Sequence, residues 1–135
     1  MVLLIDANII LDVLLNRREF VKDSSMIWKL CETGKAKGYV SALTFANLVY
    51  IMRKQLNSEE IENVFRKLSL IFDFTDLSVS DLTRAAELNR KDFEDAVQSV
   101  TAERVHADYI ITRNVRNFSG SRVIAFTPTE LLARI

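Results

Sequence analysis

Short runs of apolar residues alternate along the chain with longer segments in which apolar residues recur every three or four positions. A short apolar run bounded by polar residues is typical of a buried parallel strand, and the longer period is typical of a helix packed on a sheet. The alternation predicts an α/β fold in which helices cover both faces of a central parallel sheet. The expected strands lie at residues 2–5, 38–41, 72–77, 109–112 and 123–125.

The expected helices are marked by their ends as well as by their periodicity. They cover residues 8–15, 20–32, 43–56, 58–70, 79–90 and 93–107, with a last helix that starts near residue 128. Capping-box spacing at Asn57, Ser78 and Thr127 indicates three of the starts. Gly34 is expected to end the second helix in the left-handed conformation. The helix at 43–56 is apolar on most sides, so it should be largely buried.

Length and composition are those of an ordinary globular protein. The 135 residues predict one domain over residues 1–135, and 18 basic residues balance 18 acidic ones. Any binding of nucleic acid therefore needs a local basic patch. The single cysteine, Cys31, excludes an internal disulfide and is expected to be a buried thiol, which is consistent with a cytoplasmic location. The N-terminal apolar run is too short for a signal peptide, and no segment is long enough to span a membrane.

Polar side chains follow two of the expected strands directly. Asp6 comes after the first strand, and Thr112 and Asn114 come at the end of another. Open parallel sheets place their chemistry outside the carboxyl ends of the strands, so these side chains are expected to lie at one edge. The alternative is that Asp6 only caps the helix that follows it.

Three further polar residues belong to the same candidate site. Asp92 and Asp95 stand three residues apart at a helix start and share one face, where both could equally serve as capping residues. Asn47 lies in an otherwise apolar helix. Its amide group therefore needs a ligand or a hydrogen-bond partner, for example on a second helix. If the groups converge, their carboxylate and amide oxygens suit Mg²⁺ or Mn²⁺, and such a metal can activate water for phosphodiester cleavage. The only histidine, His106, lies near a helix end and supports no Ser-His-Asp site.

Four segments taken together resemble the PIN domain family, and in particular the small VapC-like bacterial toxins. They are residues 4–12, 41–44, 92–98 and 111–118. The resemblance implies a Rossmann-like, three-layer α/β/α fold with a central parallel sheet. It also implies an endoribonuclease that depends on Mg²⁺ or Mn²⁺, with an RNA substrate, an antitoxin protein as partner and a homodimeric state.

The resemblance also assigns roles to individual residues. Asp6 matches the first acid of the family, and Asp95 matches the acid that opens the penultimate long helix, with Asp92 as its acidic neighbour. These three are the expected metal ligands. Thr112 matches a threonine that orders the site, which makes it a supporting residue.

Two positions depart from the family pattern. Asn47 stands where the family usually has Glu, and Asn114 stands where many members have Asp. Both are expected to complete the catalytic site through neutral contacts or by positioning water. The run 42–47 resembles a branch of the family in which Asn at this position is usual. The exchange removes up to two negative charges from the metal site, so metal affinity is expected to fall.

Two other functions fit parts of the same pattern. The missing carboxylates are consistent with a PIN fold that does not cleave and instead binds RNA or a protein. A phosphatase of the haloacid dehalogenase type also carries Asp after its first strand, but it needs a second Asp where this chain has Asn8.

Overall fold

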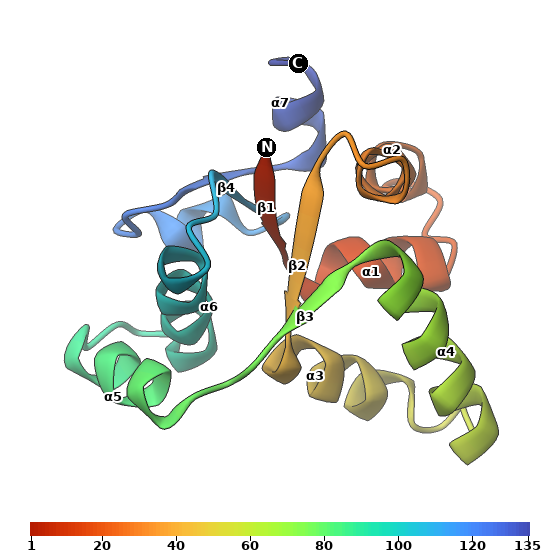
Figure 1. The fold of residues 1–135 in the computed structure, drawn as a ribbon, viewed down its shortest axis with the longest axis horizontal. Helices are drawn as coiled ribbons and strands as arrows, with labels where there is room; N and C mark the ends of the chain where they lie inside the picture. The colour runs from red at the N-terminus through yellow and green to blue at the C-terminus, as the bar shows by residue number, and fades with distance from the viewer.

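The computed structural model describes all 135 residues and contains one five-stranded sheet with helices on both faces (Figure 1). The strands are β1 (Val2–Ile5), β2 (Lys37–Ser41), β3 (Asp73–Thr75), β4 (Tyr109–Ile111) and β5 (Ile124–Phe126). Their order across the sheet is β3-β2-β1-β4-β5, and every neighbouring pair is parallel. The expected three-layer α/β/α fold is therefore confirmed.

Seven α-helices and one short 3₁₀ helix connect the strands. They are α1 (Ala7–Leu14), α2 (Val21–Glu32), α3 (Ala42–Met52), α4 (Ser58–Ile71), α5 (Val79–Glu87), α6 (Phe93–Arg104), η1 (Val115–Phe118) and α7 (Pro128–Leu132). The three predicted capping boxes all form, at the starts of α4, α5 and α7. Gly34 has a φ of +78°, as expected for the residue that follows a helix end. None of the helices is both long enough and apolar enough to cross a membrane.

The central strand β1 divides the apolar core in two. Leu3 and Ile5 point to the face that α1, α2, α3 and α4 cover, whereas Leu4 points to the opposite face and packs with Ala102 of α6 (Figure 1). This alternation follows from the period of two along a strand. Burial on both faces explains why β1 is a continuous apolar run.

Close packing between α2 and β2 accounts for Cys31 and Gly38. The Cys31 thiol is 8% exposed, which confirms the expected buried thiol, and burial raises its pKa to about 12. A Cβ added at Gly38 would lie 2.7 Å from Cys31 Sγ, so only glycine lets the strand approach the helix. Trp28 of α2 is 5% exposed and packs edge-on against Phe72, so it belongs to the core.

Helix α3 differs from its prediction in length and burial. It ends at Met52 instead of reaching Leu56, and its buried residues are Thr44, Leu48 and Met52, which recur every fourth position. Tyr50 is 65% exposed and Ile51 is 49% exposed. The expectation of a largely buried helix was wrong because only one stripe of α3 faces the sheet. Leu43, Tyr50 and Ile51 instead line a cavity at the edge of the sheet.

Candidate active site

The carboxyl ends of β1 and β4 meet at the centre of the sheet, where the strand order reverses. Crevices at such a point are the usual ligand sites of open α/β sheets. Asp6 directly follows β1, and its backbone N–H donates to Ile111 O at 2.9 Å. Its carboxylate also caps α1, because Asp6 Oδ1 accepts from the backbone N–H of Ala7 at 2.8 Å. Asp6 is therefore a helix cap and a residue of the crevice at once.

Thr112 orients the second oxygen of the Asp6 carboxylate. Its hydroxyl donates to Asp6 Oδ2 at 2.7 Å and accepts from the backbone N–H of Asn114 at 3.0 Å. The Thr112 side chain is fully buried and does not reach the cavity. The expected supporting role is consistent with this position, since Thr112 fixes the carboxylate without lining the crevice.

The start of α6 supplies two more carboxylates. Asp92 is the N-cap, and its Oδ1 accepts from the backbone N–H of Asp95 at 3.2 Å. Asp95 Oδ2 is buried and has no hydrogen-bond partner. Buried carboxylate oxygens are almost always satisfied, so an orphaned one is a candidate position for a bound cation or an ordered water.

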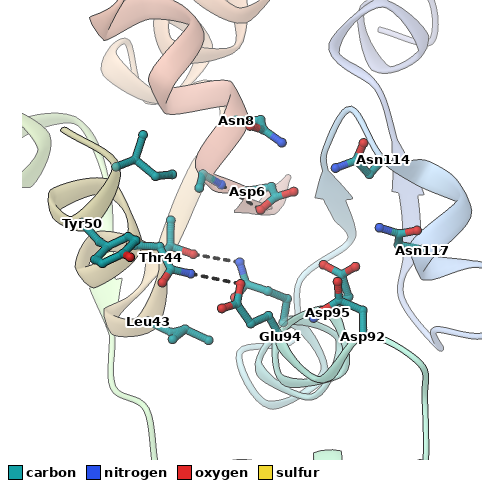
Figure 2. A pocket seen from close by; sticks show the side chains of 14 residues that line it. Asp6, Asn8, Leu43, Thr44, Tyr50, Asp92, Glu94, Asp95, Asn114 and Asn117 are labelled. Atoms are coloured by element: carbon teal, nitrogen blue, oxygen red, sulfur yellow. Dashed lines mark hydrogen bonds between the residues drawn. The ribbon is translucent and has the colours of Figure 1, made fainter.

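These groups line a cavity of about 350 Å³ (Figure 2). Five of the six candidate residues line it, namely Asp6, Asn47, Asp92, Asp95 and Asn114. In Figure 2 Asp6 lies near the centre of the view, with Asp92, Asp95 and Asn117 on one side of it and Tyr50 on the other. Glu94 adds a fourth carboxylate, and no lysine or arginine lines the cavity.

The crowding of carboxylates changes their protonation. Burial, followed by the charges of Asp92 and Asp6, raises the pKa of Asp95 to about 6, although Asn117 offsets part of the effect. Burial also raises the pKa of Asp6, against the opposing effect of its hydrogen bond from Thr112. A bound cation would reverse these shifts because it stabilises the charged form of each carboxylate.

The donor chemistry fits a hard divalent cation. All polar side chains around Asp6 and Asp95 carry oxygen atoms that can act as metal ligands, and Asp95 Oδ2 has no hydrogen-bond partner. No three Asp, Glu, His or Cys side chains lie close enough together to hold one metal ion. A metal would therefore take one or two carboxylates and complete its coordination with amide oxygens or water.

Asn47 forms a hydrogen bond to a second helix, which was the structural alternative to a role in ligand binding. Its Nδ2 donates to Glu94 Oε2 at 3.3 Å and so joins α3 to α6 (Figure 2). Asn47 also lines the cavity, so this structural contact is compatible with its predicted place in the site. Glu94 was not among the candidates, since an exposed acid in the first turn of a helix is ordinary for the helix dipole.

A buried polar network below the cavity was also missed. Ser41 Oγ donates to Gln98 Oε1 at 3.0 Å, and Gln98 Nε2 donates to Thr44 Oγ1 at 2.8 Å. All three side chains are buried, and they fix the start of α3 against α6. A sequence signal was present, because Gln98 is a long polar residue in a helix segment that is otherwise buried and mostly apolar.

Asp12 is the second group that sequence reasoning passed over. It is fully buried in α1, and its Oδ2 accepts from Ser24 Oγ at 2.9 Å. Its Oδ1 forms ion pairs with Arg17 at 3.4 Å and with Arg113 at 3.3 Å. The guanidinium of Arg113 is held between Asp12 and the ring of Phe20. Asp12 therefore fixes the segment that carries Asn114.

The raised pKa of Asp95 predicts how the metal-free protein responds to pH. Its folded value of about 6 exceeds the unfolded value of 3.8, so the protonated group favours the folded state below pH 3.8, and this contribution disappears as pH rises through 6. At pH 7.5 the folded state carries the repulsion of the ionised group. Asp95→Asn should then raise the free energy of unfolding by about 1 kcal/mol, discounted for screening by solvent.

Urea unfolding in EDTA at pH 7.5 and pH 4 measures this effect. The advantage of Asp95→Asn should shrink at the lower pH, where wild type is itself protonated. An advantage that is equal at both pH values would show that charge repulsion is not its cause.

Comparisons with known proteins agree with this geometry. Residues 2–116 match the family model of the PIN domain, whereas no curated protein matches the chain. VapBC2 from Rickettsia felis, solved with a DNA fragment from its promoter, has a TM-score of 0.72 at 17% identity, covering 94% of this chain and 98% of its own. VapBC-1 from Haemophilus influenzae has the same TM-score and identity, with 96% and 99% covered.

A toxin–antitoxin complex from Klebsiella pneumoniae is similar as well, with a TM-score of 0.69 and 21% identity over 93% of this chain and 96% of that one. At these identities the likeness concerns the fold. The family match spans the strands and helices that bring Asp6, Asp92 and Asp95 together. On that match, the chain belongs to the PIN domain family.

Proposed function

We propose that this protein is a metal-dependent endoribonuclease and the toxin of a toxin–antitoxin pair. The observation that carries the proposal is the orphaned, buried Oδ2 of Asp95, which lies in a cavity with three other carboxylates and no basic residue. The similar structures from Rickettsia, Haemophilus and Klebsiella are toxin–antitoxin complexes or VapBC proteins, which supports the same class.

Asp6 and Asp95 would hold Mg²⁺ or Mn²⁺, with Asp92 beside them, directly or through water. The metal would lower the pKa of a bound water and offset charge on the phosphate. Thr112 keeps the Asp6 carboxylate in one orientation. Asn47 and Asn114 present neutral groups at the rim of the cavity, where they would position water or a substrate oxygen.

The proposed function as a toxin also predicts the partners of this protein. We infer that an antitoxin covers the acidic cavity, with the exposed Tyr50 and Ile51 at its rim as apolar contacts. Trp28 of α2 is buried and offers no such contact. Gel filtration with light scattering tests the expected homodimer, and a monomer at all concentrations would contradict it.

Cleavage of a mixed set of labelled RNAs tests the proposed activity. Cleavage should occur with Mg²⁺ or Mn²⁺ and stop with EDTA. Since sequence-specific RNA enzymes read loops and unstacked bases, the set should include both structured and single-stranded RNAs. Absence of cleavage by folded protein across the whole set would contradict the proposal.

A second candidate function is a PIN fold that binds RNA or a protein without cleaving. It is favoured by the absence of three acidic side chains close enough to share a metal, together with the amides at Asn47 and Asn114. Calorimetry with Mn²⁺ separates the two candidates. Tight binding that is lost in Asp6→Asn would count against the second one.

Restoring a carboxylate at position 47 should strengthen metal binding. Asn47 lines the cavity beside Glu94, so Asn47→Glu adds a negative charge where the cation is expected. Because cation affinity rises with the charge of the ligand set, the Kd for Mn²⁺ should fall about 10-fold. Calorimetry at pH 7.5 measures it, with Asn63→Glu on the exposed face of α4 as the matched control. Equal changes in both variants would refute a local effect.

A further inference from the structure

The acidic cavity by itself opposes the binding of an RNA strand. Asp6, Asp92, Glu94 and Asp95 line it without a single basic residue. Every phosphate of the strand is negatively charged, so the phosphates beside the cleaved bond need a positive surface that begins at the rim of the cavity. The chain as a whole supplies none, because 18 basic residues balance 18 acidic ones.

A second hollow, of about 660 Å³, adjoins the acidic cavity. The two share Asp92 and Asn117 in their walls. One wall of the second hollow is the turn between α5 and α6, which carries Arg90 and Lys91, and the other is η1, which carries Arg116. No apolar side chain lines it. We call it the basic hollow.

The three cations of the basic hollow are not neutralised by ion pairs. None of Arg90, Lys91 and Arg116 takes part in the ion pairs of the structure. The single acid in the hollow, Asp92, lies at the edge shared with the acidic cavity. The hollow therefore has a net positive charge and keeps it free for a ligand.

Arg90 is half-buried, whereas the other two cations are exposed. Arg90 Nη1 donates to Ser99 Oγ at 3.5 Å. A Cβ built on Gly120 would lie 3.1 Å from Arg90 Nη2, so the glycine leaves room for the guanidinium. Lys91 and Arg116 are exposed on the two walls, and neither forms an ion pair.

The other borders of the acidic cavity do not offer this chemistry. A hollow on the far side of Asn114 contains Arg113, but Glu19 and Asp23 line it too, and Arg113 is paired with Asp12. The border at Tyr50 and Ile51 is apolar and exposed. Only the basic hollow joins the acidic cavity to unpaired positive charge.

We propose that the basic hollow binds the sugar–phosphate backbone of the RNA strand next to the cleaved bond. Lys91 and Arg116 contact its phosphates from opposite walls, and the half-buried Arg90 supplies a third charge. The inference rests on the proposed function for its ligand, but binding at this hollow requires neither metal nor cleavage.

Fluorescence anisotropy in EDTA tests the proposal with a labelled single-stranded RNA of about a dozen nucleotides. The double variant Lys91→Gln/Arg116→Gln should raise the Kd about 10-fold at low salt. The slope of log Kd against log salt concentration should fall by about 1.4, which is about 0.7 for each lost phosphate contact of a single strand. Arg90 is left unchanged because it also contacts the buried Ser99.

The control is Lys29→Gln/Lys35→Gln, which removes the same charge at two exposed positions that line neither hollow. Its Kd and salt slope should match those of wild type. Equal losses in both variants would show general attraction and overturn the proposal. Unchanged affinity of Lys91→Gln/Arg116→Gln for the RNA, or no salt-dependent binding of RNA by wild type, would overturn the proposal as well. The basic hollow would then be a candidate surface for a protein partner.

Cleavage by the same proteins separates this inference from the proposed function. With metal present, Lys91→Gln/Arg116→Gln should raise KM while kcat stays close to that of wild type. RNA binding through the hollow without any cleavage would refute the nuclease and retain the hollow. Cleavage with KM and Kd unchanged in the variant would refute the hollow and retain the nuclease.

Discussion

Asp6→Asn is expected to lower metal-dependent RNA cleavage by at least about 100-fold. The substitution keeps the shape of the side chain, and its amide oxygen can still accept from the Ala7 backbone N–H or the Thr112 hydroxyl. It removes the negative charge that would hold the cation at the junction of β1 and β4. Loss of a group that only supports a metal ligand costs 10- to 100-fold, so loss of a ligand itself should cost at least as much.

Initial rates of RNA cleavage in Mg²⁺ or Mn²⁺ measure this effect. Asp76→Asn is the matched control, since Asp76 is exposed and does not line the cavity. Its rate should stay within about twofold of wild type because distant surface changes have small effects. If Asp6→Asn cleaved RNA as fast as wild type, Asp6 would have no part in the activity and the proposed metal site would be wrong.

Asp12→Ala is expected to destabilise the protein by about 3–5 kcal/mol. Asp12 is fully buried, and its carboxylate joins α1 to Ser24 of α2 and to Arg113 beyond β4. Removing one partner of a buried ion pair leaves the other without compensation, and this cost exceeds what the intact pair contributes. A cavity in place of the carboxylate adds to the loss.

Urea unfolding at neutral pH measures the change, with Asp76→Ala as the control for removal of an exposed carboxylate. The control should stay within about 0.5 kcal/mol of wild type. Combining Asp12→Ala with Arg113→Ala gives the coupling between the two residues: the double variant should lose at least about 1 kcal/mol less than the sum of the two single losses, because the residues are in contact. Independent, additive losses would show that the ion pair is not the source of the stability.

Local sequence signals predicted most of the fold because the physics behind them is local. Capping needs only a few consecutive residues, so the starts at Asn57, Ser78 and Thr127 were placed correctly. The burial of α3 was predicted wrongly, because hydropathy gives no information on which apolar face meets the sheet. Tyr50 and Ile51 are exposed for that reason.

The site was only partly predictable from the sequence. Asp6, Asp92, Asp95, Asn47 and Asn114 were predicted to meet, and they line one cavity. The network of Ser41, Thr44 and Gln98 was not predicted, although each residue lay in a segment that carries the family resemblance. Its partners come from two helices more than fifty residues apart, and polar pairing across that separation leaves no periodic signal.

What the sequence determined by itself was the set of elements, their order and the chemical identity of the acids at the strand ends. These depend on periodicity, on caps and on the rule that parallel strands present their carboxyl ends at one edge. The tertiary structure decided which charges remain free. It neutralises Arg113 through Asp12 and leaves Arg90, Lys91 and Arg116 unpaired, and it strips water from Asp95 so that its pKa rises. Charge pairing and desolvation depend on distances through space, which no reading along the chain contains.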